Sequence, residues 1–179
     1  MNNMSYEEKA RIEKAPLQYK IYKGIRGQFG AMRFNLKKAW SNSDIRKAEG
    51  VVFLEMAPTI GPNVYDWQYQ KMVMALGIVD IPKIIMYLRT PAHQMFTDKQ
   101  NSNKKNLKIY HDKGAGTPNE GKNIKTLKID KPENANNFFF SIYQKDEDSK
   151  TTATVTVSPD EAIVIGTLLQ AAIPRILAW

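Results

Sequence analysis

The sequence predicts an α+β fold in which a group of strands followed by a helix occurs twice. Lys, Arg and aromatic residues alternate with Ile and Leu in segments such as 17–26 and 122–129, and a period of two is typical of a half-buried strand. Pro and Gly separate these segments, as expected at strand ends. Two apolar segments, 80–89 and 158–177, start with residues that favour the first turn of a helix.

The first half of the chain opens with a lead-in, residues 1–16, whose charged segment 5–14 favours a short helix that Pro16 ends. Strands are predicted at 17–26, 29–37 and 50–57, the last closed by Pro58 and Gly61-Pro62, and a polar connection at 40–49 precedes the third. Alternation divides the second strand between two faces, with Met32, Phe34 and Leu36 on one and Ala31, Arg33, Asn35 and Lys37 on the other.

Residues 64–79 fit two structures. Met72, Val73 and Leu76 have helical spacing, whereas the alternate residues from Trp67 to Ala75 fit one face of a strand, and periodicity leaves both open. A helix is predicted next at 80–89, because Asp80 can cap it and a proline falls in its first turn.

The second half repeats this order. A polar loop is predicted at 97–105, and strands are predicted near 106–112, 122–130, 138–145 and 151–157. Ser158-Pro159-Asp160-Glu161 then has the sequence of a capping box with Pro at the first helical position, which predicts a helix to about Leu177.

The last helix is apolar on most sides. A helix of this kind is buried on most sides. We expect it to pack partly on its own sheet and partly on another subunit, with a central helix in a monomer as the alternative. The apolar stripe is Ala162, Ile165, Leu169, Ile173 and Ile176, widened by Ile163, Leu168, Ala172 and Leu177.

The composition favours an anionic partner. The chain has 179 residues, 42% of them hydrophobic, a net charge of +8 and a pI of about 9.5, which predicts a globular domain at 17–179 that prefers polyanions such as nucleic acid. There is no Cys, so disulfides and thiol nucleophiles are excluded. The polar N-terminus predicts no signal or transit peptide, and no apolar run reaches the roughly 18 residues of a membrane span. We expect an intracellular protein, cytoplasmic or nucleoid-associated, of bacterial, phage or similar source.

Catalytic and metal sites are not expected. Residues 116–123 nearly match a P-loop, but Asn123 stands where Ser or Thr would hold magnesium, and a strand rather than a helix is predicted after it. His93 and His111 are isolated histidines, and His111 beside Asp112 is more typical of a strand end than of a catalytic pair. We therefore expect no enzymatic activity, no metal and no cofactor.

Cations and aromatic rings share strand faces. Lys and Arg neutralise phosphates and rings stack on unpaired bases, so such a face suits single-stranded nucleic acid. Burial in the core is the alternative for any one ring. The combinations are Tyr22 with Lys20 and Arg26, Tyr110 with Lys108, and Tyr143 with Lys145.

Short motifs follow one another in a distinctive order along residues 17–179. Val51–Pro58 precedes Val64-Tyr65-Asp66-Trp67. Then come His111-Asp112, Asn119–Lys122 with the following Lys125–Ile129, Asn137–Phe139 and a helix ending in Pro174 and Trp179. In this order they resemble the Whirly family of single-stranded DNA-binding proteins. A similar architecture occurs in mitochondrial guide-RNA-binding proteins and in a transcription coactivator.

The resemblance implies two four-stranded antiparallel sheets, each followed by a helix, and a strand at 65–78. It also implies tetramers built through the helices, here Ser158–Trp179, with single strands running along the sheet surfaces between subunits. The Lys-Gly-Lys-Ala-Ala-Leu motif of the family is half present as Lys23-Gly24, with Ile25 at the second Lys. Either Arg26 or Arg33 supplies that charge.

We expect a homo-oligomeric, non-enzymatic binder of single-stranded DNA that acts in replication, recombination or repair with little sequence preference. The alternatives are an RNA-binding or annealing protein and a transcription regulator that binds melted DNA, both on the same fold. The expected nucleic-acid-binding residues are Lys20, Tyr22, Lys23, Arg26, Arg33, Lys37, Trp67, Tyr69, Lys71, Lys108, Tyr110, Lys122, Lys125, Lys128 and Tyr143.

Overall fold

The computed structural model describes residues 18–22, 29–37, 40–41, 47–48, 50–89, 97–98, 101–113, 115–132, 134–146 and 149–177. Side chains are described for 29–37, 50–89, 106–113, 115–132, 134–145 and 149–177. The helix expected at 5–14 lies outside the described residues.

The first sheet is antiparallel and has four main strands in the order β1 (Gln18–Tyr22), β2 (Gly30–Lys37), β5 (Val51–Gly61) and β7 (Met72–Leu76). A short strand, β6 (Val64–Tyr65), pairs with the far end of β5. The predicted connection at 40–49 contains a small hairpin of β3 (Trp40–Ser41) and β4 (Lys47–Ala48). Alternation in β2 places Met32, Phe34 and Leu36 on the buried face, as predicted.

The second sheet contains all four of the strands predicted in the second half. They are β9 (Asn101–Asp112), β10 (Ile124–Asp130), β11 (Phe138–Asp146) and β12 (Ser149–Val157), antiparallel and in the order β12-β11-β10-β9. A short strand, β8 (Thr97–Asp98), extends the sheet beyond β9. The buried face carries Ile109, Leu127, Phe140 and Val155. The expectation of two four-stranded antiparallel sheets is confirmed.

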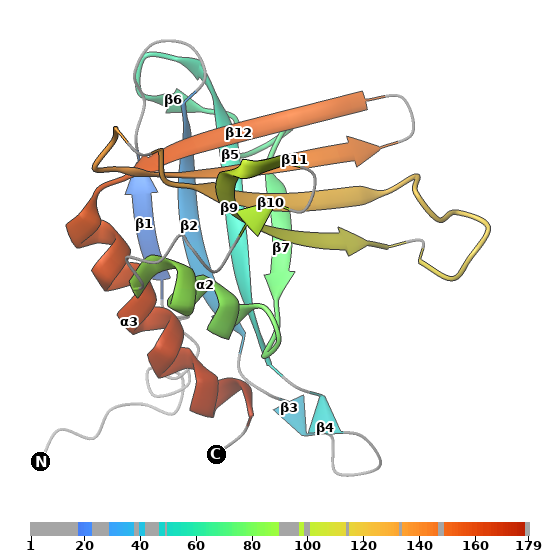
Figure 1. The fold of residues 1–179 in the computed structure, drawn as a ribbon. Helices are drawn as coiled ribbons and strands as arrows, with labels where there is room; N and C mark the ends of the chain where they lie inside the picture. Colours follow the sequence, from blue (N-terminus) through green and yellow to red (C-terminus); the bar gives the residue numbers. More distant parts are fainter. Residues whose placement is uncertain are drawn as a thin grey trace, which may run out of the picture.

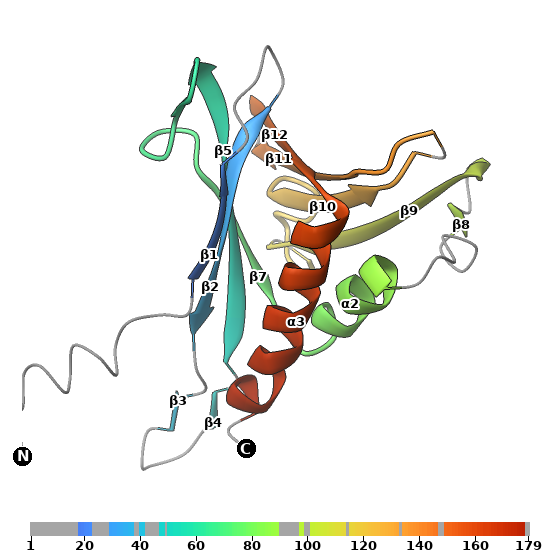
Figure 2. The same cartoon turned by 90° about the vertical axis from the view of Figure 1, so that its left-hand side faces the viewer.

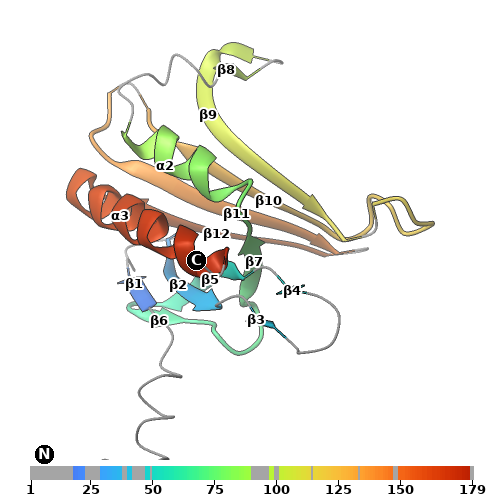
Figure 3. The ribbon, with the colours of Figure 1, turned by 90° about the horizontal axis from the view of Figure 1, so that it is seen from below.

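Two helices lie in the angle between the sheets, whose strands run across each other (Figure 1, Figure 2). Helix α2 (Ile81–Arg89) follows the first sheet and α3 (Pro159–Ile176) follows the second, as predicted. Figure 3 shows the helices side by side, and the Arg89 guanidinium donates to Oε1 of Gln170 at 2.6 Å. Because the core fills this angle, each sheet keeps one outer face that points away from the helices.

The two sheets meet at the start of β2. Phe29 forms a parallel bridge with Thr154 of β12, and its carbonyl oxygen accepts the backbone N–H of Thr59 at 3.1 Å. Gly30 is required here, because a Cβ at this position would collide with the carbonyl oxygen of Ala57. The absence of a side chain thus allows β2 and β5 to approach closely at the sheet junction.

Helix α3 covers the buried face of the first sheet. Ile165, Leu169 and Ala172 lie against Phe34 and Leu36 around a cavity of about 20 Å³. The helix start follows the predicted capping box in that the Glu161 carboxylate accepts the Ser158 backbone N–H at 2.8 Å and its hydroxyl at 2.9 Å. At the end of the helix, the backbone N–H of Gly50 donates a hydrogen bond to the carbonyl oxygen of Ile176, at 3.0 Å.

Two predicted boundaries in the first half are wrong. Residues 65–78 do not form one strand, because turns occupy most of 66–71. The Asp66 carboxylate accepts the backbone N–H of Tyr69 at 2.8 Å, and such a local bond competes with strand pairing. Pro58 does not close β5, which continues to Gly61, at the second closing signal, Gly61-Pro62. The Pro58 carbonyl accepts the N–H of Asp66 at 3.0 Å, so this residue joins the sheet as an acceptor.

The predicted polar loop at 97–105 is also wrong. Strand β9 begins at Asn101 and β8 pairs with it, with Thr97 opposite Lys105 and Asp98 opposite Asn101. Alternation identifies a strand through its apolar face, and this polar sequence has no such face to detect.

Candidate nucleic-acid interface

A row of hydroxyl and aromatic side chains crosses the outer face of the second sheet. Thr126 of β10 lies between Tyr110 of β9 and Tyr143 of β11, and Thr152 of β12 follows Tyr143. The two tyrosines are 58% and 42% exposed, so their rings are available to a ligand. Strands are about 4.8 Å apart, which separates the tyrosine backbones by about 10 Å. We call these four residues the tyrosine row.

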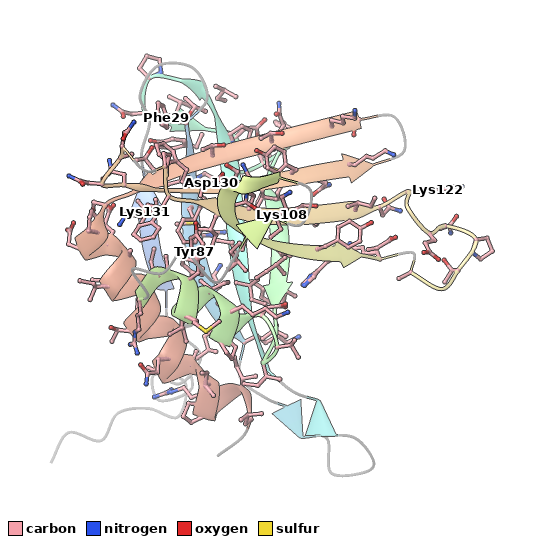
Figure 4. The ribbon with its side chains drawn as sticks, in the orientation of Figure 1. Phe29, Tyr87, Lys108, Lys122, Asp130 and Lys131 are labelled. Carbon is pink, nitrogen blue, oxygen red and sulfur yellow. The ribbon has the colours of Figure 1, made fainter. Side chains whose placement is uncertain are left out.

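Lysines flank the tyrosine row on both sides. Lys108 and Lys128 pair across β9 and β10, two residues along each strand from the tyrosine row. Lys145 and Lys150 pair across β11 and β12 on the other side of the row. Because residues two apart share a face, all four lie on the outer face with the tyrosines. Figure 4 shows Lys108 on this sheet.

One of these lysines has a carboxylate neighbour. The Lys128 ammonium lies 2.7 Å from Oδ2 of Asp130, and both side chains are about a quarter exposed, at 25% and 27%. Ion pairs at such exposure contribute about 0–1 kcal/mol. A phosphate can therefore compete for Lys128 at little cost in stability.

Lys125 occupies the opposite face of β10. Its ammonium donates to the carbonyl oxygen of Val73 at 2.8 Å, which joins the second sheet to the edge strand β7 of the first. Next to it in register, His111 Nε2 lies 3.1 Å from Oδ2 of Asp80, the residue before α2. These contacts connect the two sheets, so Lys125 is not brought together with Lys108, Lys128 and the tyrosine row.

The outer face of the first sheet presents an internally paired cation. The Arg33 guanidinium forms an ion pair with Glu55 at 2.5 Å, and Glu55 lies directly opposite in register. The same guanidinium lies over the Trp67 ring, 4.7 Å from its centroid, a distance typical of cation–π contacts. The structure thus brings together two of the expected binding residues, Arg33 and Trp67, but in contact with each other.

Three other expected residues are exposed around this sheet. Tyr69 is 82% exposed in the turn before β7, with Lys71 exposed after it, and Lys37 is exposed at the end of β2. The Asp66–Tyr69 hydrogen bond holds the turn that presents Tyr69. These side chains are available to a ligand but do not form a continuous row with the tyrosines of the second sheet.

The remaining expected residues lie at strand ends or outside the described side chains. Lys20 and Tyr22 are in β1, where their backbones pair with Arg33 and Ala31. Lys23 and Arg26 lie outside the described residues.

Lys122 is exposed in the connection after β9, at the far end of the sheet (Figure 4). In this connection the Asp112 carboxylate accepts the N–H of Gly121 at 2.8 Å, and Gly121 has φ 80°. Strand β10 starts at Ile124. The near P-loop sequence therefore leads into a strand and does not open a helix, as predicted.

Tyr87 anchors α2 to the second sheet and has the one resolved pKa shift among the described residues. Burial and the nearby Asp130 carboxylate raise the pKa of its hydroxyl from 10.0 to about 12, opposed by a backbone hydrogen bond from Lys131. The Tyr87 ring also meets Phe138 edge-on, at 6.4 Å between centroids. Figure 4 shows Tyr87 beside Asp130 and Lys131. This tyrosine has a structural role, in contrast to Tyr110 and Tyr143.

The chain matches one family model, described as Whirly transcription factor, over residues 21–168. It belongs to the Whirly family. Proteins of this family are non-enzymatic nucleic-acid binders, which agrees with the expectation from the sequence.

One curated Whirly relative is the chloroplastic single-stranded DNA-binding protein WHY1 of Solanum tuberosum, which is 27% identical over 133 residues. The match covers 73% of this chain and 43% of the relative, so the chain spans less than half of that protein.

The Whirly fold is equally clear from solved structures. WHY1 from Arabidopsis thaliana superposes with a TM-score of 0.72 at 20% identity, covering 93% of this chain and 88% of that one. A guide-RNA-binding protein complex bound to its RNA superposes with a TM-score of 0.56 at 10% identity, covering 92% and 94%. At these identities the likeness establishes the fold alone.

Neither a metal-ligand cluster nor a membrane-spanning helix occurs among the described residues of this Whirly chain. Its residues contain no group of three or more His, Cys, Asp or Glu side chains placed to hold a metal ion. None of its described helices has the length and apolar character needed to cross a membrane.

The expected binding residues did not include four residues of the outer face, Thr126, Lys145, Lys150 and Thr152, although the sequence placed Lys145 on the face of Tyr143. Lys150 and Thr152 lie in a Thr-rich strand that has neither an aromatic ring nor a family motif to mark it. Alternation in β12 contained the signal, because Lys150 and Thr152 have the opposite phase to the buried Val155 and Val157.

Proposed function

We propose that this Whirly protein binds single-stranded DNA through the outer face of its second sheet, and that residues 17–179 act as one binding domain. The observation that carries the proposal is the tyrosine row between lysine pairs. Rings at this spacing can stack on unpaired bases while lysines neutralise the phosphates on either side. The potato relative, named as a single-stranded DNA-binding protein, supports the same function.

The proposed contacts are not selective for sequence. Stacking on a ring accepts every base, and lysine contacts to phosphate carry no sequence information. A binder with these properties can protect single strands during replication, recombination or repair, and we propose that class of role.

We further propose that the protein assembles through α3, as a tetramer. Ile163 and Val164 are 69% and 40% exposed on the side of α3 that faces away from the sheets. Apolar side chains exposed together on a helix are typical of an interface. Light scattering is expected to show a species larger than a dimer, and a monomer at micromolar concentration would contradict the assembly.

Two other candidate functions keep the same surface. An RNA-binding role is favoured by the superposition on a guide-RNA-binding complex. A regulatory role on melted DNA is favoured by the family description as a transcription factor. Competition between DNA and RNA of equal sequence distinguishes the first, and a strong preference for one sequence or for duplex identifies the second.

Fluorescence anisotropy with labelled oligo-dT tests the main proposal. We expect a Kd well below micromolar at low salt. If Lys108, Lys128, Lys145 and Lys150 each contact one phosphate, log K falls with log salt at a slope of about −3. Micromolar or weaker binding at low salt, or affinity that does not change with salt, would refute the proposal.

A further inference from the structure

The outer face of the second sheet is hollowed at one end. A groove of about 160 Å³ lies between β10, β11 and β12. Pockets that hold a drug-sized molecule start at about 300 Å³, so this groove has room for a much smaller group. Its lining combines a ring, hydroxyls and cations, namely Ile124, Thr126, Tyr143, Gln144, Lys145, Lys150, Thr151 and Thr152.

Two like charges face each other at this groove. Lys145 of β11 and Lys150 of β12 are directly opposite in register, and both are exposed. Like charges at opposite positions destabilise an antiparallel pair. Among the side chains that the structure describes, no carboxylate forms an ion pair with either lysine. A bound anion would relieve this repulsion.

We propose that the groove is a subsite for one nucleotide of a single strand. The Tyr143 ring stacks on the base, the hydroxyls of Thr126 and Thr152 face its edge, and the lysine pair holds its phosphate. The groove takes one base only, which requires that base to be unpaired. The inference rests on the proposed function and adds where on the sheet one nucleotide binds.

A substitution in the lysine pair tests the subsite, because it should raise thermal stability and weaken DNA binding. Lys150→Glu places a carboxylate opposite Lys145, so it replaces a repulsion by an attraction in the free protein. We therefore expect a higher Tm without DNA. The same change removes a phosphate contact, so we expect binding of oligo-dT to weaken at least about fivefold at 0.1 M salt and the salt slope to fall by about 0.7.

Lys83→Glu is the matched control. Lys83 is exposed on α2, away from the outer face, and its substitution changes the net charge by the same amount. The control is expected to keep the wild-type salt slope. If wild-type protein binds oligo-dT and Lys150→Glu binds as Lys83→Glu does, the subsite is refuted while the proposed function stands. If wild-type protein fails to bind, the proposed function itself fails.

A second pair of variants tests the stacking. Tyr143→Ala is expected to weaken binding by about 5-fold to about 150-fold, the range for loss of one stacked base. Tyr143→Phe keeps a ring of the same shape and is expected to retain most of the affinity. Equal affinity of Tyr143→Ala and wild type, or an equal loss in both variants, would overturn the assignment of the base to this ring.

Discussion

Lys125 and Lys128 offer a test of the two faces of β10 within a single strand. They are three residues apart, and the register places Lys128 on the outer face with Lys108, whereas Lys125 donates to the Val73 carbonyl at the sheet junction. We predict that Lys125→Met lowers stability and leaves DNA binding nearly unchanged. Lys128→Met should weaken DNA binding and leave stability nearly unchanged.

The size of each effect follows from the contacts. A hydrogen bond from a charged donor contributes about 1.5–3 kcal/mol, and Lys125 is partly exposed, so we expect a loss of about 1–2 kcal/mol. In a chain of this length that lowers the Tm by about 2–8 °C. Lys128→Met loses the partly exposed ion pair with Asp130, which contributes about 0–1 kcal/mol to stability. It also removes one phosphate contact, which reduces the salt slope by about 0.7.

The assay combines thermal unfolding with anisotropy titrations on oligo-dT at several salt concentrations. A slope change of about 0.7 is about a fivefold change in affinity over a tenfold change in salt, so it is measurable. The reasoning is refuted if Lys125→Met has the altered salt slope and Lys128→Met does not. That result would place the DNA on the junction side of the sheet.

Two further predictions concern stability. Gly30→Ala should lower the free energy of unfolding by about 1–3 kcal/mol in urea titrations, because the new Cβ overlaps the Ala57 carbonyl oxygen. Gly77→Ala is the control, because no atom lies within 4 Å of its new Cβ. Equal stability of the two variants would contradict the close approach at Gly30. The pKa of Tyr87 is raised from 10.0 to about 12 by folding, so its contribution is complete below about pH 10 and is lost as pH rises through about 12. Tyr87→Phe should therefore lose less stability than wild type over that range, and parallel pH profiles would contradict this.

Strands β10, β11 and β12 and helix α3 could be predicted closely because each of them has a buried apolar face. In β10, Leu127 and Ile129 alternate with polar residues, and in α3 the apolar stripe meets the first sheet, so local pattern and packing agree. The turn at 66–71 could not be predicted in the same way. It depends on a carboxylate that binds a backbone N–H three residues on, and periodicity carries no information about that contact.

The sequence predicted which types of residue lie on the binding surface, but not which other residues each of them contacts. Alternation assigned Arg33 to the outer face of β2 correctly, yet its neutralisation by Glu55 depends on the register of β5. Lys125 shows the same limit, because its acceptor lies in another sheet, 52 residues away in sequence. Tyr110 and Tyr143 come together through β10, so the tyrosine row exists only once the order of three strands is known.

The position of α3 has a consequence for how the chain folds. The helix that covers the first sheet is synthesised after the strands of both sheets, and it packs on Phe34 and Leu36 from a strand more than 120 residues earlier. Contacts of such long sequence separation form late. During synthesis the face formed by Phe34, Leu36 and Val52 therefore stays open to water until α3 packs on it, and exposed apolar surfaces associate. A nascent chain that stops before Ser158 would present this face to chaperones or to aggregation.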